Sequence, residues 1–273
     1  MSTQAEKGKI FRALHAQDGA FIIPNPWDVG TARLLAALGF EALATTSAGY
    51  AFSVGQRDNT VGRDEMIAHV AAIASATDLP VSADLENGFG DDPETVAQTI
   101  RLAAAAGLVG GSIEDASNRP DDPIYAHDIA VERMRAASEA SRALAFPFTL
   151  TGRAENYLHG RPDLKDTIKR LQAYQDAGAD VLFAPGLTSK EDIAAVVSSV
   201  DRPVNVVMGL QGVQLSLAEL AAIGVKRVSV GSALSRAALG AFLRAAREMR
   251  EHGTFDFAND AVSYRDISAM FKA

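Results

Sequence analysis

The chain has 273 residues, of which 48% are hydrophobic and 22% charged, the balance of an ordinary folded protein. Its 26 Lys and Arg against 34 Asp and Glu give a net charge of −8, which argues against nucleic-acid or anionic-membrane partners, because both need basic surfaces. The lack of cysteine excludes disulfides, thiolate metal sites and cysteine nucleophiles. No run reaches the ~20 apolar residues of a membrane helix, and the start lacks the apolar core of a signal peptide, so we expect a cytoplasmic protein.

Short β-rich runs alternate with longer amphipathic runs along the whole chain. In chain order, the strands are expected at 21–24, 42–46, 81–84, 109–113, 148–153, 181–184, 204–207 and 227–230. The helices are expected at 6–17, 31–38, 63–77, 93–106, 128–145, 164–177, 190–198, 217–223 and 233–251. Eight strand–helix repeats without a linker predict a single α/β domain, 1–273, that is a (β/α)8 TIM barrel; an open doubly wound sheet is the alternative.

The C-terminal tail is long for a barrel and carries one apolar stripe at helical spacing. The stripe comprises Leu239, Phe242, Leu243, Ala246 and Met249, and more aromatic residues follow it. Such a stripe is typical either of a helix that closes the barrel or of an arm that packs on another subunit. We predict additional C-terminal helices in an arm, 238–273, and a homodimer or homotetramer.

Acidic residues follow neighbouring strands at the end where barrel active sites lie. Asp84 and Glu86 are two residues apart and share a face if the third strand continues that far. Glu114 follows the fourth strand, and Arg153 ends the fifth with an inward side chain. Carboxylates brought together repel unless a cation lies between them, and oxygen ligands without Cys or His pairs suit Mg²⁺ or Mn²⁺. The Arg153 guanidinium would hold the carboxylate of a small anion.

Other polar residues have simpler explanations. Asp28 and Asp58 are typical of caps or turns, Asp115 points to the other face from Glu114, and the remaining expected helix caps are Asp91, Asp92 and Ser232. His159 lies in the loop after the fifth strand and is a candidate proton carrier.

In this order the motifs resemble those of the isocitrate lyase/phosphoenolpyruvate mutase superfamily. The resemblance covers about 21–240 and rests on Pro24–Asn25–Pro26–Trp27–Asp28, Thr46–Ser47–Ala48–Gly49 with Asp58, Asp84-x-Glu86-x-Gly88-Phe89-Gly90, Ile113–Glu114–Asp115, Arg153, and Ala177–Gly178–Ala179–Asp180.

The resemblance implies a barrel whose C-terminal helices are often exchanged between subunits, and a Mg²⁺ cofactor with Asp84 as direct ligand. Asp58, Glu86 and Glu114 would hold the ion directly or through water. Thr46, Ser47 and Ala48 would line the substrate oxyanion pocket, and Arg153 would bind the substrate carboxylate. Members of the family act on 2-oxo acids, or release them, by breaking C–C or C–P bonds through a metal-bound enolate.

The chain departs from the family at the lid after the fourth strand, where 116–123 contains neither Cys nor Lys. It also lacks the Glu that the lyases of the family carry at the end of the sixth strand. Asn205 is out of register with the Asn that those lyases carry on the seventh strand. We therefore predict a Mg²⁺-dependent lyase or decarboxylase for a small 2-oxo or 2-hydroxy dicarboxylate. The alternatives are C–P chemistry on a phosphonopyruvate-like substrate and a barrel that binds a 2-oxo acid without turnover. The segment 116–126 is predicted to be a mobile lid without an apolar anchor.

Overall fold

Eight parallel strands form a nearly closed barrel in the computed structural model, which describes residues 2–210 and 214–271. The order around the sheet is β1-β10-β9-β8-β7-β4-β3-β2. Between the two edge strands, the Ala44 amide donates to the Pro24 carbonyl at 3.0 Å. The predicted (β/α)8 barrel is confirmed, with strands β1 (Phe21–Ile23), β2 (Leu43–Ala44), β3 (Val81–Asp84), β4 (Gly110–Glu114), β7 (Thr149–Arg153), β8 (Val181–Phe183), β9 (Val204–Val207) and β10 (Arg227–Ser229).

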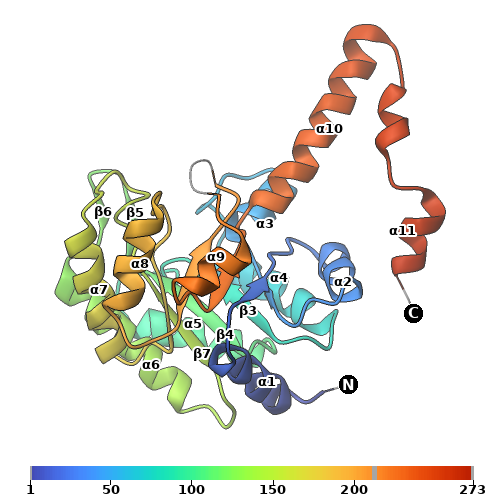
Figure 1. Ribbon diagram of the computed structural model, residues 1–273. Coiled ribbons are helices and arrows are strands. Elements are labelled where there is room, and N and C mark those ends of the chain that lie inside the picture. Colours follow the sequence, from blue (N-terminus) through green and yellow to red (C-terminus); the bar gives the residue numbers. More distant parts are fainter. Residues whose placement is uncertain (1, 211–213, 272–273) are drawn as a thin grey trace.

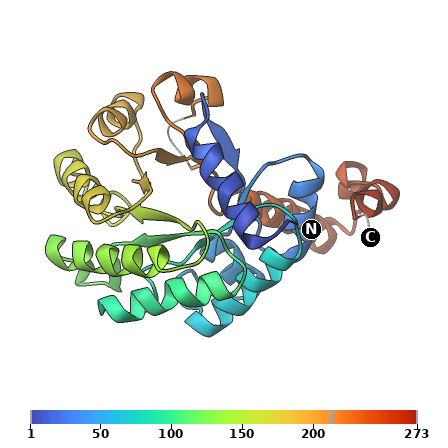
Figure 2. The same cartoon turned by 90° about the horizontal axis from the view of Figure 1, so that it is seen from below.

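The helices surround the strands and begin where capping side chains are available (Figure 2). Asp28 caps α2 and Asp92 caps α5 by accepting backbone N–H groups, as expected from their positions. Asp91 is no cap, because its carboxylate pairs with Arg119 at 2.9 Å. The predicted helices correspond to α1 (Gln4–Ala16), α2 (Val29–Ala37), α4 (Arg63–Ser75), α5 (Pro93–Ala105), α6 (His127–Arg142), α7 (Leu164–Asp176), α8 (Lys190–Ser198), α9 (Leu217–Ala222) and α10 (Ala233–His252).

Three short elements were not expected from the sequence, namely α3 (Ser47–Ser53) and the antiparallel pair β5 (Ala116–Arg119) and β6 (Asp122–Ile124). The additional C-terminal helices predicted in 238–273 are present as the 3-10 helix η1 (Asp256–Asp260) and α11 (Tyr264–Met270). The pair β5–β6 occupies the predicted lid. Ile124 and Tyr125 at its base are only 2% and 3% exposed, so the expectation of a lid without an apolar anchor is wrong.

An apolar plug seals the lower end of the barrel, where the strands begin. Phe11 and Leu14 of α1 pack with Phe21 and other buried side chains of the first strands. A Cβ atom on Gly110 would lie 2.8 Å from the Phe11 ring, so glycine at this point of β4 leaves room for the plug. The barrel therefore opens toward the carboxyl ends of its strands.

The C-terminal elements leave the barrel. Helix α10 projects away from it and the chain then turns back through η1 to α11 (Figure 1). Several large apolar side chains along this part are exposed to solvent, namely Leu239, Phe242, Leu243, Met249, Phe255 and Tyr264. Among the described residues, no helix is both long and apolar enough to span a bilayer.

Candidate active site

A cavity of about 200 Å³ extends from the upper rim into the barrel. Most of its lining residues are polar, but they include the apolar side chains of Phe183, Pro185 and Val207. Six of the predicted site residues line the cavity: Thr46, Ser47, Ala48, Asp58, Asp84 and Arg153. Glu86, Glu114 and His159 are not part of its lining.

Asp84 is the central acid of this site. Its Oδ2 atom accepts hydrogen bonds from the Ser47 amide at 3.2 Å and the Ser47 hydroxyl at 3.0 Å, and the same hydroxyl lies 2.9 Å from Asp58 Oδ1. The hydroxyl has one proton, so it can donate to only one of the two carboxylates at a time. Burial, and then the charge of Asp84, raises the pKa of Asp58. The two acids are thus held close together with little to separate their charges.

Glu86 does not share a face with Asp84, because β3 ends at Asp84 and Glu86 has a φ of 49°. The expectation that the strand continues through Glu86 is therefore wrong. The Glu86 side chain is 4% exposed, and its Oε1 atom is buried without a hydrogen-bond partner. Burial, followed by the charges of Asp84 and Asp58, raises the pKa of Glu86 to about 8.

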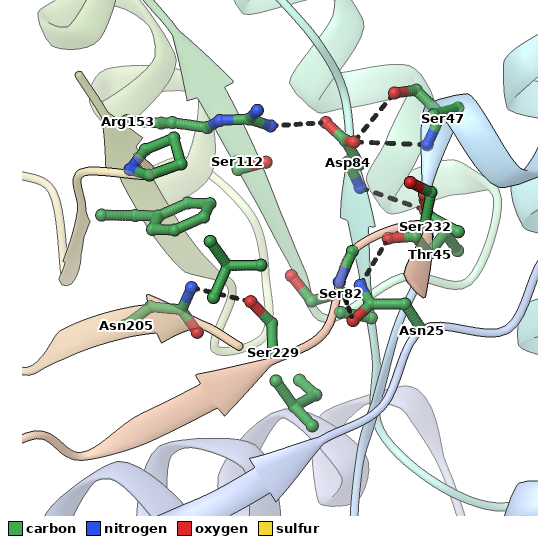
Figure 3. Close-up of a pocket in the computed structure, with 18 of the residues that line it drawn as sticks. Asn25, Thr45, Ser47, Ser82, Asp84, Ser112, Arg153, Asn205, Ser229 and Ser232 are labelled. Atoms are coloured by element: carbon green, nitrogen blue, oxygen red, sulfur yellow. Dashed lines mark hydrogen bonds and ion pairs between the residues drawn. The ribbon is translucent and has the colours of Figure 1, made fainter. Parts of the chain in front are cut away.

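Arg153 joins the acids from the opposite side of the cavity (Figure 3). Its Nη1 atom lies 3.1 Å from Glu114 Oε2 and 3.4 Å from Asp84 Oδ1, and its Nε atom donates to Glu155. Burial raises the pKa of Glu114 well above its usual value, although Arg153 opposes this. Glu155 had no predicted role, yet it fixes the guanidinium that faces the cavity.

The acids fit a divalent ion that is bound mainly through water. Among residues 2–210 and 214–271, no three His, Asp or Glu side chains are arranged to hold a metal directly. A hard divalent ion commonly takes one or two protein carboxylates and keeps several waters, and Asp84 and Asp58, bridged by the Ser47 hydroxyl, offer such a pair. The unpartnered oxygen of Glu86 and the raised pKa values of Asp58, Glu86 and Glu114 are features that a cation would satisfy.

Of the other residues singled out in the sequence, some lie at or beside the cavity and others stabilise the barrel. His159 Nε2 lies 3.9 Å from Glu155 Oε2, and its neighbour Leu158 lines the cavity. Asp115 is structural, as expected, because it accepts hydrogen bonds from Tyr174 and Arg170. Ser232 stands at the N-cap position of α10, as expected, but its side chain makes no capping hydrogen bond and lines the cavity.

The sequence analysis missed the floor of the cavity. Arg227, Asn205 and Ser229 point into the barrel, and the Arg227 side chain donates to Asn205 and to Thr151 on the far wall. Their signal was the alternation of polar and apolar residues in Arg227–Ser229. It could have been found, since inward barrel positions are normally filled by Val, Ile and Leu.

Comparison with known proteins places these features in context. The profile of the phosphoenolpyruvate phosphomutase family matches residues 11–250. A crystal structure from Burkholderia cenocepacia J2315, provisionally described as a lyase/mutase, is 70% identical, covers 99% of this chain and 97% of its own, and superposes with a TM-score of 0.97. Oxaloacetate acetylhydrolase with its product oxalate is 26% identical, with 99% and 95% covered and a TM-score of 0.88. An oxaloacetate decarboxylase from Chromohalobacter salexigens is 29% identical, with 88% and 84% covered.

Proposed function

The chain belongs to the phosphoenolpyruvate phosphomutase family, within the isocitrate lyase/phosphoenolpyruvate mutase superfamily of lyases and mutases, and we propose that it cleaves a C–C bond of a small 2-oxo or 2-hydroxy dicarboxylate. The observation that carries this proposal is the group of carboxylates around Asp84 that faces Arg153 across a cavity large enough only for a small molecule. The relatives named for oxaloacetate chemistry support the same class of substrate.

Members of this superfamily use a divalent metal ion, and we propose Mg²⁺ for this chain. Asp84 would bind the ion directly, while Asp58, Glu86 and Glu114 would hold it directly or through water. The ion would supply Lewis-acid stabilisation of the negative charge that develops on the 2-oxo oxygen as the bond breaks.

The remaining site residues bind and orient the substrate. Two N–H groups on Nη2 of Arg153 are not used by Glu155, Glu114 or Asp84, so they are available to a substrate carboxylate. The segment Thr46 to Ala48 lines the adjoining wall. Phe183, Pro185 and Val207 add apolar surface to the lining, and the Arg153 guanidinium lies 5.2 Å from the centroid of the Phe183 ring, so bound substrate would displace water from a partly apolar site.

His159 is our candidate proton carrier. Burial lowers its pKa, so the ring is neutral at pH 7 and can accept a proton. Its loop borders the cavity through Leu158. A His159→Gln variant that retained the wild-type turnover and pH profile would remove it from this role.

Turnover with a panel of substrates tests the proposal. We would measure product formation from oxaloacetate, substituted malates and phosphonopyruvate, each with Mg²⁺ and with EDTA. Metal-dependent cleavage of a dicarboxylate is the expected result. Turnover of phosphonopyruvate alone would favour C–P chemistry, and binding of these acids without any turnover would favour a barrel that only binds them.

We further propose that 238–273 packs on another copy of the chain in a homodimer or homotetramer. The exposed apolar side chains of α10 and the segment after it support this, since Phe242 is 65% and Phe255 67% exposed. Burial of such residues stabilises association by about 25 cal/mol per Å². Sedimentation of the full chain should show an oligomer, and removal of the residues after Ala238 should give monomer or aggregate. A well-folded monomer of the full chain would contradict the proposal.

A further inference from the structure

A second arginine, Arg227, lies inside the barrel below Arg153. It begins β10 and is 5% exposed. Its Nε atom donates to Asn205 Oδ1 at 2.9 Å, Nη2 donates to Thr151 Oγ1 at 3.0 Å, and Nη1 lies 3.4 Å from His15 Nε2. The side chain therefore crosses the lumen from β10 to β7 and forms the floor of the cavity.

The charge of Arg227 has no counter-charge in the described part of the chain. All three of its partners are neutral groups, because His15 is itself uncharged: burial, with a contribution from Arg227, lowers the His15 pKa to about 3. Burial also lowers the pKa of Arg227 to about 9, which still leaves the guanidinium charged at neutral pH. Arg153, by contrast, faces three carboxylates.

The residues that form the floor also carry N–H and O–H groups that the contacts given above do not use. A guanidinium has five N–H groups, and the three contacts above use one each, so two remain. Asn205 Nδ2 donates to Ser229 Oγ at 3.0 Å, which leaves the Ser229 hydroxyl proton available. Arg227, Asn205 and Ser229 all line the cavity, and Figure 3 shows Asn205 and Ser229 at the end away from Arg153 and Asp84. A buried charge without a partner is costly, so an anion would be stabilised here.

We propose that Arg227 and Ser229 form an anion subsite that binds the second carboxylate of a dicarboxylate substrate, while its 2-oxo or 2-hydroxy acid end lies at Asp84 and Arg153. Thr151, which contacts Arg227, is two residues below Arg153 on β7, a rise of roughly 6.6 Å. This separation suits a diacid of about four carbons. The inference rests on the proposed function, which it deepens by assigning the residue that selects diacids over monoacids.

Calorimetric binding of malate and lactate in Mg²⁺ buffer tests the subsite, since malate differs from lactate by one carboxylate. We expect the wild type to bind malate at least tenfold more tightly than lactate. Arg227→Met should abolish that difference by weakening malate alone, and Arg227→Lys should restore part of it by keeping the charge. Lys226→Met is the matched control, because this neighbour binds the Gln17 carbonyl outside the cavity. It should leave both affinities unchanged.

A thermal-shift measurement separates the subsite from the proposed function. Formate, the smallest carboxylate, should raise the melting temperature of metal-free wild type but not of Arg227→Met, with ionic strength held constant by the bulky HEPES anion. If malate and lactate bind with equal affinity and Arg227→Met changes neither, the subsite is wrong and the proposed function stands. If neither acid binds but formate stabilises only the protein with Arg227, the subsite stands and the proposed function is wrong. No effect of formate on wild type, together with equal binding of both acids, would overturn the inference even if Arg227→Met fails to fold.

Discussion

The upper end of the barrel gathers charged side chains, whereas its lower end is closed by apolar ones. At the upper end, several carboxylates lie close together, one oxygen of Glu86 is buried without a partner, and the pKa values of Asp58, Glu86 and Glu114 are raised. At the lower end, α1 inserts Phe11 and Leu14 among apolar strand residues, and the buried His15 is neutral. The upper end keeps charges that a bound ion and substrate would neutralise, whereas the lower end is closed by apolar packing. Substitutions at the lower end should therefore reduce the free energy of unfolding without changing metal affinity. Substitutions at the upper end should weaken metal or substrate binding with little change in stability.

The largest expected effect is at the plug. Phe11→Ala should reduce the free energy of unfolding by about 3–5 kcal/mol, because Phe11 is fully buried and the truncation leaves a cavity. Denaturant titration measures this, with Ile10→Ala on the same helix as the control, since Ile10 is 45% exposed. Mg²⁺ affinity of the folded variant should match the wild type. A loss of metal binding at full stability would break the division between the two ends.

The positions of the strands could be predicted from the sequence, whereas some residues of the candidate site could not. The eight strands were predicted to within a few residues because buried parallel strands are short apolar runs between clear helix stops. Asp84 and Glu114 were singled out from the sequence because each stands at the carboxyl end of a predicted strand, and the structure places them at the ends of β3 and β4. The turn at Glu86 was missed, since its φ of 49° is set by tertiary packing and not by the local sequence. Arg227 was missed because a charged residue at the start of a strand was not considered as an inward side chain.

The second effect concerns acid stability. His15 Nδ1 contacts the Phe11 carbonyl at 2.7 Å and therefore carries the ring proton, which leaves Nε2 to face Arg227. Since the folded pKa of about 3 lies below the unfolded value of 6.5, the unfolded chain takes up more protons as the pH falls through this range. The stability from His15 is complete above pH 6.5 and should fall by about 2 kcal/mol between pH 6.5 and 5.

Denaturant titration from pH 7.5 to 5 measures this slope. It should be shallower in His15→Gln, with His252→Gln on the exposed end of α10 as the control. Part of the slope should persist in both variants, because burial also lowers the pKa of His69 to about 4. A slope equal to that of the wild type in His15→Gln would show that the ring titrates normally in the folded barrel.

At the upper end, Asp84→Asn should weaken Mg²⁺ binding at least tenfold, or about 1.4 kcal/mol, because the amide lacks the charge that a hard cation requires. Metal-free stability should change by less than about 1 kcal/mol, since the amide oxygen can still accept from Ser47. Calorimetry with Mg²⁺ and a denaturant titration in EDTA measure the two quantities. Unchanged Mg²⁺ affinity would remove Asp84 as the metal ligand.

Arg153→Lys is the most conservative test of the upper end. Lysine keeps the charge beside Glu114 and Glu155 but loses the planar fork that holds two carboxylate oxygens at once. The affinity for pyruvate or oxalate should therefore fall at least tenfold in calorimetry with saturating Mg²⁺, while the melting temperature changes little. Both ligands are small enough to occupy the acidic end of the cavity without reaching Arg227. Wild-type affinity in the lysine variant would place the anion elsewhere, with Gly231 and Ser232 on the rim of the same cavity as the next residues to substitute.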